Sequence, residues 1–336
     1  MMKRRYKLIF AIILIVGASQ LIILGLLYYF NFGGAVDKVK FGATFAPAQA
    51  RYFGLDPKKV LTDALDDLKI KNYRLSAYWN VVEPWRGGYD FSEVDWQLDE
   101  VAKRGGSVIL AIGRRLPHWP ECHDPKWIKG VAEKQVQKEV LNLLTKTVER
   151  YKNRKVITAW QVENEPFLSV FGECPPPDAK FYESELKLVR SLDSRPIIMT
   201  ESGELSTWAR AAFLADKVGV SLYRIVLNKI WGKFYYPLTP AYYRYRAQAI
   251  RALGKPIFVS ELQAEPWEVG TPLPEAPILE QKNFIDGAKI HDSIEFAKRA
   301  SFDEIYFWGL EWWAWLRSHG DNDIWDTIKQ EVASNQ

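Results

Sequence analysis

Short apolar runs alternate with longer amphipathic stretches along the chain from Lys40 onward. Each run is four to six residues long and rich in apolar and β-branched residues, as is typical of buried strands in a parallel sheet. The intervening stretches place apolar residues at helical spacing, for example in Pro57–Leu68, Glu93–Lys103, Lys134–Tyr151 and Tyr242–Leu253. We interpret the runs as strands at Phe41–Phe45, Tyr73–Tyr78, Val108–Ile112, Ile157–Val162, Pro196–Thr200, Gly219–Tyr223, Ile257–Ser260 and Ile305–Leu310.

The number and spacing of these units predict an α/β fold, a (β/α)8 TIM barrel over residues 40–336. Such barrels typically take about 250 residues, which this stretch accommodates. The structural alternative is a doubly wound open sheet. That fold usually has a glycine-rich phosphate loop after its first strand, and no such loop follows Phe45.

A second pattern occupies the N-terminus, where Leu8 to Phe30 form a run of 23 residues whose only polar members are Ser19 and Gln20. A helix of about 20 residues spans the hydrocarbon core of a bilayer. We therefore expect a transmembrane signal anchor at residues 8–30, after a cytoplasmic basic stub at 1–7 and before a tether at 31–39. The cell membrane would hold the protein in a single pass, with the N-terminus cytoplasmic and the barrel extracytoplasmic.

A cleaved signal peptide is the alternative to an anchor. Its apolar run is usually about 7–15 residues and ends in a small-x-small site. Here the run is longer and ends in Leu-Leu-Tyr-Tyr-Phe, which favours the anchor, although later cleavage stays open.

The formal charge of +4 belongs to this N-terminal segment. Residues 1–30 hold four basic residues and no acidic ones, so that 41 basic and 41 acidic residues remain in the rest of the chain. A neutral barrel domain gives no support for nucleic-acid binding, and we set that function class aside.

Two strands end in a glutamate. The run beginning at Val156 stops at Asn164-Glu165-Pro166, because proline cannot donate to the strand ladder and disfavours helix in the residue before it. The run Pro256–Ser260 leads directly into Glu261. Active sites of these barrels lie at the carboxyl ends of the strands. The pair therefore suggests an enzyme that works with two carboxylates.

Aromatic and cationic side chains follow the other strand ends, where a carbohydrate site needs them. Aromatic faces stack on the apolar faces of pyranose rings, while carboxylates perform proton transfer and covalent chemistry. A single Trp is more often packing than ligand platform, so we expect substrate contacts only from those just past strand ends. These are Trp79, Trp119, Trp267 and Trp308.

The chain resembles clan A glycoside hydrolases over residues 40–330, most of all the cellulase-type members of glycoside hydrolase family 5. The segments that carry the resemblance are Trp160–Pro166, Trp79 with Glu83-Pro84, Val259–Glu261 and Tyr306–Gly309. Two departures mark an atypical member. Ser221 stands where the family has His, and Arg114 and Arg115 stand where a His ends the third strand.

The resemblance implies a retaining O-glycosyl hydrolase that cleaves β-linked glycans or glycosides by double displacement. In that family the first glutamate is the acid/base and the second the nucleophile, which fall on Glu165 and Glu261. A polysaccharide or oligosaccharide would be the substrate, and no cofactor is implied. The matching substrate-site residues are Asn164 for the sugar 2-hydroxyl, Arg74 and Tyr223 beside the nucleophile, and Trp308 beneath the reacting sugar.

Two alternatives stay open beside hydrolysis: transglycosylation, in which a sugar accepts the intermediate, and a catalytically silent membrane-anchored barrel that binds glycan. Three further acids compete for roles. We expect Glu163 to face away from Glu165, Glu201 to be a rim acid that could bind a sugar hydroxyl, and Glu265 to lie too far into its loop to be the nucleophile.

The remaining candidates concern metals and cysteines. With four His and no His-Glu-x-x-His spacing, the sequence does not suggest a catalytic metal. Cys122 follows the third predicted strand and Cys174 the fourth, so the two lie in neighbouring loops on one face of the barrel. A disulfide between them is possible, and an extracytoplasmic location permits it.

Overall fold

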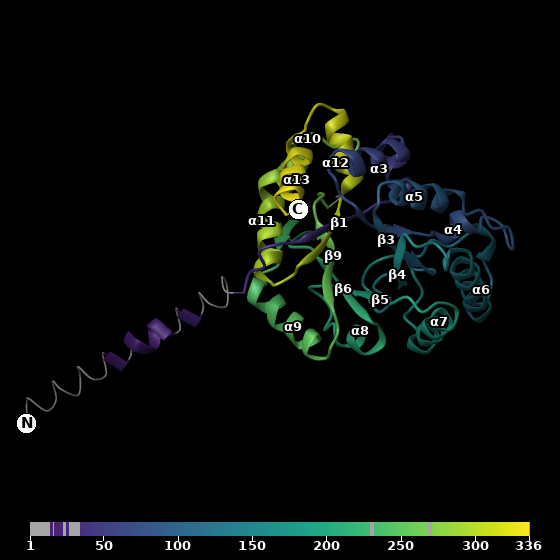
Figure 1. Ribbon diagram of the computed structural model, residues 1–336, viewed down its shortest axis with the longest axis horizontal. Helices are drawn as coiled ribbons and strands as arrows, with labels where there is room; N and C mark the ends of the chain where they lie inside the picture. Colours follow the sequence, from purple (N-terminus) through teal and green to yellow (C-terminus); the bar gives the residue numbers. More distant parts are fainter. Residues whose placement is uncertain are drawn as a thin grey trace, which may run out of the picture.

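The computed structural model describes residues 14–15, 17–22, 25–26, 34–228, 232–267 and 271–335. Its parallel strands close into a barrel in the order β1-β10-β9-β6-β5-β4-β3-β2 (Figure 1). The predicted (β/α)8 barrel is therefore confirmed, and each predicted strand overlaps an observed one. The strands are β1 (Lys40–Thr44), β2 (Asn72–Ser76), β3 (Ser107–Ile112), β4 (Ile157–Val162), β5 (Ile197–Glu201), β6 (Lys217–Leu222), β9 (Ile257–Gln263) and β10 (Glu304–Trp308).

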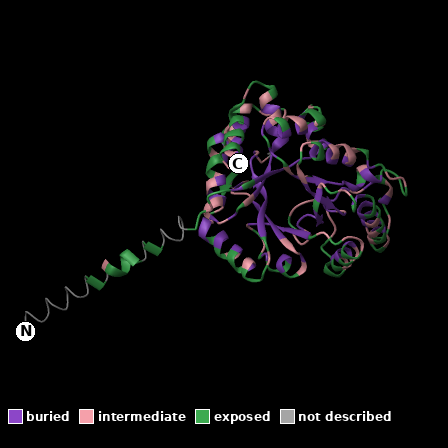
Figure 2. Cartoon of the chain, in the orientation of Figure 1, coloured by how far each residue is buried: buried purple, intermediate pink, exposed green. Residues whose placement is uncertain are grey.

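Amphipathic helices surround the barrel, with their buried residues turned toward the strands (Figure 2). Several begin as their sequences favour: the side chains of Asp56, Asp178 and Asp286 accept hydrogen bonds from the first-turn amides. The outer helices are α3 (Pro57–Asp66), α5 (Ser92–Lys103), α6 (Glu133–Tyr151), α7 (Ala179–Leu192), α8 (Ala209–Leu214), α9 (Pro240–Ala252), α11 (Gly287–Arg299) and α13 (Asp323–Ser334). Shorter ones lie in the connections: α2 (Pro47–Tyr52), α4 (Trp79–Val82), η1 (Lys126–Ile128), α10 (Ile278–Phe284) and α12 (Leu310–Ser318).

An apolar cluster fills the barrel interior. It consists of Ile109, Ala159, Ile198, Phe258 and Tyr306, all at most 5% exposed. Polar side chains at the carboxyl ends of the strands, among them Arg74, Gln161 and Glu261, are buried as well. The barrel therefore has a packed apolar interior beneath a buried polar layer.

One glycine makes this interior packing possible. A Cβ at Gly42 would lie 2.6 Å from the Tyr306 ring and 2.8 Å from the Asn72 carbonyl oxygen. Any larger residue on β1 would have to displace the ring or the neighbouring strand.

A two-stranded antiparallel hairpin, β7 (Ile225–Asn228) and β8 (Gly232–Tyr235), follows β6 and was not predicted. Ile225 is buried, whereas all four residues of β8 are exposed, so the alternation of buried and exposed positions is weak. The hairpin lies on the carboxyl side of β6, where it can contribute to the rim of the barrel.

A disulfide joins Cys122 in the loop after β3 to Cys174 in the loop after β4, with a Cα–Cα distance of 5.3 Å. The same loops are tied by a hydrogen bond from the Glu173 amide to the Pro120 carbonyl, 2.9 Å long. The two loops therefore form one cross-linked unit at the top of the barrel.

The transmembrane segment predicted at residues 8–30 lies mostly outside the described residues. The described part of the chain contains no helix that is both long and apolar enough to cross a membrane. The anchor therefore stays a prediction.

Candidate functional site

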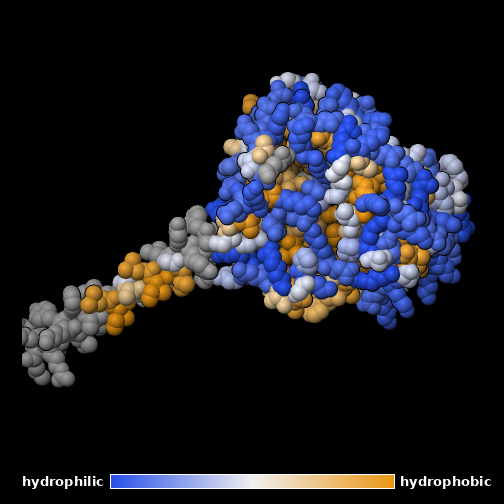
Figure 3. All heavy atoms as spheres, in the orientation of Figure 1, coloured by the Kyte–Doolittle hydropathy of each residue, from blue (hydrophilic) through white to orange (hydrophobic). Residues whose placement is uncertain are grey.

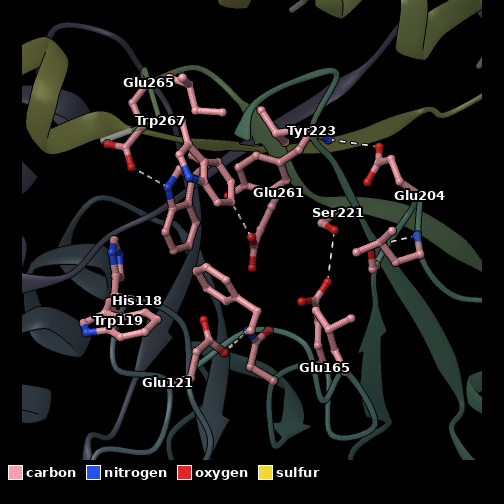
Figure 4. A pocket seen from close by; sticks show the side chains of 18 of the residues that line it. His118, Trp119, Glu121, Glu165, Glu204, Ser221, Tyr223, Glu261, Glu265 and Trp267 are labelled. Carbon is pink, nitrogen blue, oxygen red and sulfur yellow. Dashed lines mark hydrogen bonds between the residues drawn. The ribbon is translucent and has the colours of Figure 1, made fainter. Parts of the chain in front are cut away.

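A cavity of about 850 Å³ opens at the carboxyl ends of the strands. Figure 3 shows apolar residues in the middle of the visible face, surrounded by hydrophilic ones. Figure 4 shows the side chains that converge on the cavity. The lining includes His118, Trp119, Glu121, Asn164, Glu165, Phe171, Glu204, Ser221, Tyr223, Glu261, Glu265, Trp267 and Trp308.

Glu261 lies on β9, and both of its carboxylate oxygens are held by donors. Arg74 Nη1 lies 2.6 Å from Oε1, and the Tyr223 hydroxyl donates to Oε2 at 3.0 Å. Arg74 is fully buried and also donates to Gln161 Oε1 and Asn164 Oδ1, each at 2.7 Å. A charged donor and a phenol directed at one carboxylate stabilise its ionised form.

Glu165 shares the cavity with Glu261 but has a different environment. Its carboxyl group accepts a hydrogen bond of 3.0 Å from Ser221, and its amide donates to Thr200 Oγ1 at 2.9 Å. Burial raises the pKa of Glu165 to about 7, and the nearby charge of Glu261 adds to the effect. The fold thus brings the two glutamates to one cavity (Figure 4). Glu261 accepts from a charged donor, Arg74, whereas Glu165 retains its proton to near neutrality.

Asn164 connects the two halves of this arrangement. Its Oδ1 accepts hydrogen bonds from Arg74 and from the Thr200 hydroxyl, the latter at 3.0 Å, while its Nδ2 donates to Glu121 Oε2 at 3.0 Å. These contacts fix the orientation of the Asn164 amide. Arg74 and the Thr200 hydroxyl donate and need the amide oxygen, whereas the Glu121 carboxyl oxygen accepts and needs the amide nitrogen.

Glu121 was not singled out from the sequence. It lies in the loop after β3, is 4% exposed and lines the cavity. Burial raises its pKa to about 8; Arg115 opposes this, and the charges of Glu165 and Glu261 add to it. No local motif marks this residue, and its place depends on the fold of the cross-linked loops.

Glu204 was missed as well. It accepts hydrogen bonds from the Tyr223 amide at 3.1 Å and from the Tyr243 hydroxyl at 2.7 Å. Burial raises the pKa of its carboxyl to about 8. Glu204 therefore ties the strand end that carries Tyr223 to helix α9.

The aromatic rim contains three of the four predicted Trp residues. Trp308 lines the cavity, donates to Glu265 Oε1 at 2.5 Å and stacks on His118 with 4.1 Å between ring centroids. Trp119 is 59% exposed at the opening. It begins a row of ring contacts in which Trp119 meets Phe171 at 5.6 Å, Phe171 meets Trp267 at 5.8 Å, and Trp267 meets Tyr223 at 5.8 Å.

The expectation for Trp79 is wrong. It is fully buried in α4, where its indole nitrogen donates to Glu83 Oε2 at 2.8 Å and its ring packs edge-on against Trp127. The chain enters a short helix directly after β2, and this turns the indole into the core instead of the cavity. No ring face remains for a ligand.

The competing acids lie as follows. Glu163 does not line the cavity and accepts hydrogen bonds from the amides of Arg114 and Arg115, at 2.7 and 2.5 Å. Glu201 is buried on β5, outside the cavity lining, whereas Glu265 lines the cavity and binds Trp308.

The two arginines at the end of β3 support the loops. Arg114 forms ion pairs with Asp124 and Glu133. Arg115 donates to the carbonyl oxygens of Asn164 and Phe171, each at 2.9 Å. They therefore hold the backbone around the site.

No protein-family model matches the chain. Among solved structures, it is similar to xylanase 10B from Thermotoga petrophila RKU-1 in complex with xylobiose, at 14% identity and a TM-score of 0.57, over 88% of this chain and 94% of that one. It is also similar to a family 10 endo-β-1,4-xylanase from Gloeophyllum trabeum, at 17% identity and a TM-score of 0.55, over 89% and 98%.

A third similar structure is a GH5_18 protein from Streptomyces cattleya in complex with GlcNAc, at 15% identity and a TM-score of 0.54, over 81% of this chain and 70% of that one. Identities this low establish the fold alone. The expected resemblance to clan A glycoside hydrolases is thereby confirmed at the level of the barrel.

The raised pKa of Glu204 predicts a pH-dependent stability. The folded state keeps a proton that the unfolded state loses above its ordinary pKa of 4.5. The contribution of this carboxyl to the free energy of unfolding is therefore complete below pH 4.5. It falls by about 1.4 kcal/mol per pH unit as the pH rises from there, and it stops changing above about pH 8.

Glu204→Gln removes this titration while keeping an acceptor for Tyr223 and Tyr243. Urea unfolding at pH 5, 6.5 and 8 should show the variant gaining stability over the wild type as pH rises. Glu183→Gln, at an exposed position on α7, should track the wild type. A constant difference between Glu204→Gln and wild type across this range would contradict the assignment.

Proposed function

We propose that the chain is a retaining glycoside hydrolase that cleaves β-linked glycans or glycosides by double displacement. The observation that carries the proposal is the convergence of Glu165 and Glu261 on one aromatic-rimmed cavity with opposite electrostatic surroundings. Two carboxyls of opposite protonation are what this chemistry requires.

Glu261 is the proposed nucleophile. It attacks the anomeric carbon as a carboxylate and forms a covalent glycosyl ester, while the bond to the leaving oxygen breaks. Arg74 and Tyr223 direct the two oxygens and reduce the freedom lost on reaching the transition state.

Glu165 is the proposed acid and then base. Its raised pKa lets it hold a proton at neutral pH and give it to the leaving oxygen. Formation of the ester removes the charge of Glu261, and with it one cause of that raised pKa. Glu165 then accepts a proton from the water that hydrolyses the ester.

The rest of the cavity suits sugar binding. Asn164 is oriented to donate to the 2-hydroxyl, and Trp308 offers a ring to the reacting sugar. Trp119 and Trp267 extend aromatic surface toward the opening. The similar structures in complex with xylobiose and GlcNAc support a carbohydrate ligand.

The row of rings from Trp119 to Tyr223 gives one reason to keep transglycosylation as a second candidate. A second sugar stacked there would compete with water for the ester. Product analysis with and without added acceptor sugars separates the two, since only transglycosylation yields longer products. Glycan binding without any turnover would instead identify a silent binding barrel.

We further propose that residues 8–30 anchor the protein in the cell membrane with the barrel outside. The 23-residue apolar run, the basic residues before it and the Cys122–Cys174 disulfide support this placement. Full-length protein should sediment with membranes and resist carbonate extraction, whereas a chain lacking residues 1–30 should stay in the supernatant. Full-length protein in the supernatant would exclude the anchor.

Glu261→Gln should lower kcat by about 10³-fold or more on any glycoside that the wild type cleaves, because a neutral amide cannot form the ester. Aryl β-glycosides provide the assay. Glu280→Gln, an exposed substitution on α10, is the matched control and should leave rates unchanged. Near-normal turnover by Glu261→Gln would remove this residue as nucleophile.

Glu165→Ala should lose activity most on substrates with poor leaving groups, and azide should restore turnover with activated aryl glycosides by replacing the base-assisted water. The wild-type kcat/KM should fall above a pKa of about 7 as the acid loses its proton. In Glu165→Ala this alkaline limb should disappear. An unchanged limb would assign the titration to another group.

A further inference from the structure

The backbone of Glu121 is fixed on both sides. Its amide donates to the His118 carbonyl oxygen and its own carbonyl accepts from the Leu116 amide, both at 2.8 Å. The next residue, Cys122, is cross-linked to Cys174. Glu121 has a φ of 70°, a left-handed conformation that is uncommon outside glycine. A local turn and the adjacent disulfide thus hold this residue at the cavity in a backbone conformation with an energetic cost.

The contacts of the Glu121 carboxyl group fall on one oxygen. Asn164 Nδ2 donates to Oε2 at 3.0 Å, and Arg115 Nε lies 3.6 Å from the same atom. Within the described part of the chain, no hydrogen bond is made to Oε1. Figure 4 shows Glu121 beside the space into which Glu165 and Glu261 point.

The protonation of Glu121 follows from these contacts. Burial and the neighbouring acids raise its pKa to about 8, so that the carboxyl is neutral in mildly acidic solution. Asn164 donates an N–H to Oε2, whereas the single Nε hydrogen of Arg115 is donated to the Asn164 carbonyl oxygen. The hydrogen bond accepted by Oε2 places the proton of the neutral acid on Oε1. Oε1 therefore donates toward the cavity below about pH 8 and accepts above it.

Asn164 and Glu121 together present adjacent polar groups. One Nδ2 hydrogen of Asn164 is used by Glu121, and the other remains for a ligand. An amide and a carboxyl side by side match two neighbouring hydroxyls of a pyranose. No residue of the proposed double displacement needs Glu121, so its buried, strained position calls for another role.

We propose that Glu121 is a specificity-determining residue that binds, through Oε1, a hydroxyl of the reacting sugar on the side held by Asn164, at C2 or its neighbour C3. The inference rests on the proposed function, because Glu165 and Glu261 place the sugar. It goes beyond that function in adding a third carboxyl group to sugar recognition.

The test compares Glu121→Ala and Glu121→Gln with wild type in full-length, detergent-solubilised protein. The substrates are the most active aryl β-glycoside and its 2-deoxy and 3-deoxy analogues. Glu121→Ala should lower kcat/KM by about 10–100-fold on the parent glycoside but by less than about threefold on the analogue that lacks the bound hydroxyl. Which analogue escapes the loss identifies the hydroxyl.

Glu121→Gln reproduces the shape of the protonated acid, with Oε1 toward Asn164 and the amide NH2 toward the cavity. It should stay within about threefold of wild type at pH 6. Between pH 7 and 9 the ratio of its KM to that of wild type should change, because only the wild type ionises there. Glu173→Gln, an exposed substitution in the partner loop, should follow the wild type at every pH.

Equal losses on all three substrates, together with a pH-independent ratio for Glu121→Gln, would show a purely structural role and overturn the inference. Calorimetry with the parent and deoxy aryl thioglycosides measures binding without turnover, because these compounds are not hydrolysed. It separates a purely structural role of Glu121 from failure of the proposed function. Hydroxyl-specific weakening of binding by Glu121→Ala in a protein without turnover would support the inference and overturn the hydrolase. Absence of any thioglycoside binding by wild type would overturn both.

Discussion

The guanidinium of Arg74 is the interaction on which the site depends. It is fully buried and cannot lose its charge, so it must be satisfied by partners inside the barrel. It binds Gln161 on β4, Asn164 just past that strand, and Glu261 on β9. One cation on β2 thus fixes the polar layer above the apolar interior across the width of the barrel. Removing a partner would leave an uncompensated buried charge, which costs about 3–5 kcal/mol in comparable cases. The two proposed catalytic glutamates therefore belong to one electrostatic unit.

The acids around the cavity differ in how their burial is compensated: Glu261 forms a direct ion pair, whereas other buried acids have raised pKa values. Arg74 makes its direct ion pair with Glu261, and Arg115 lies farther from its carboxyl partner, at 3.6 Å from Glu121. The other buried acids lower the cost of burial by keeping their protons, with pKa values raised to about 7 for Glu165 and about 8 for Glu204. Arg74 pairs directly with Glu261, whereas Glu165 has only a hydroxyl donor on its carboxyl group, so the two carboxyls of one cavity differ in their surroundings. The chemistry proposed for the pair needs that difference.

The barrel and the positions of Glu165 and Glu261 could be predicted from sequence because both depend on local patterns that end in a recognisable residue type. Trp79 could not, since strand position says nothing about the helical turn that buries its ring. Glu163 faces away from the cavity as expected, although strand alternation alone would place residues two apart, such as Glu163 and Glu165, on the same side. Positive φ angles of 60° at Glu163 and 42° at Glu165 end the strand geometry instead. Glu121 and Glu204 depend on contacts far apart in sequence, which no local pattern contains.

Ser221 and His118 are two neutral groups among the side chains that line this cavity. The Ser221 hydroxyl stays neutral while it donates to Glu165. Burial lowers the pKa of His118 to about 3, so its ring is uncharged near neutrality. Neither residue adds a positive charge that would draw the proton from Glu165. Burial and the charge of Glu261 raise the pKa of Glu165, whereas the Ser221 hydrogen bond and the charges of Arg115 and Arg74 lower it. The resulting pKa of about 7 lies close to the value of about 8 for Glu121. Control of the pKa of this acid therefore lies mainly with its burial and with the charge of Glu261.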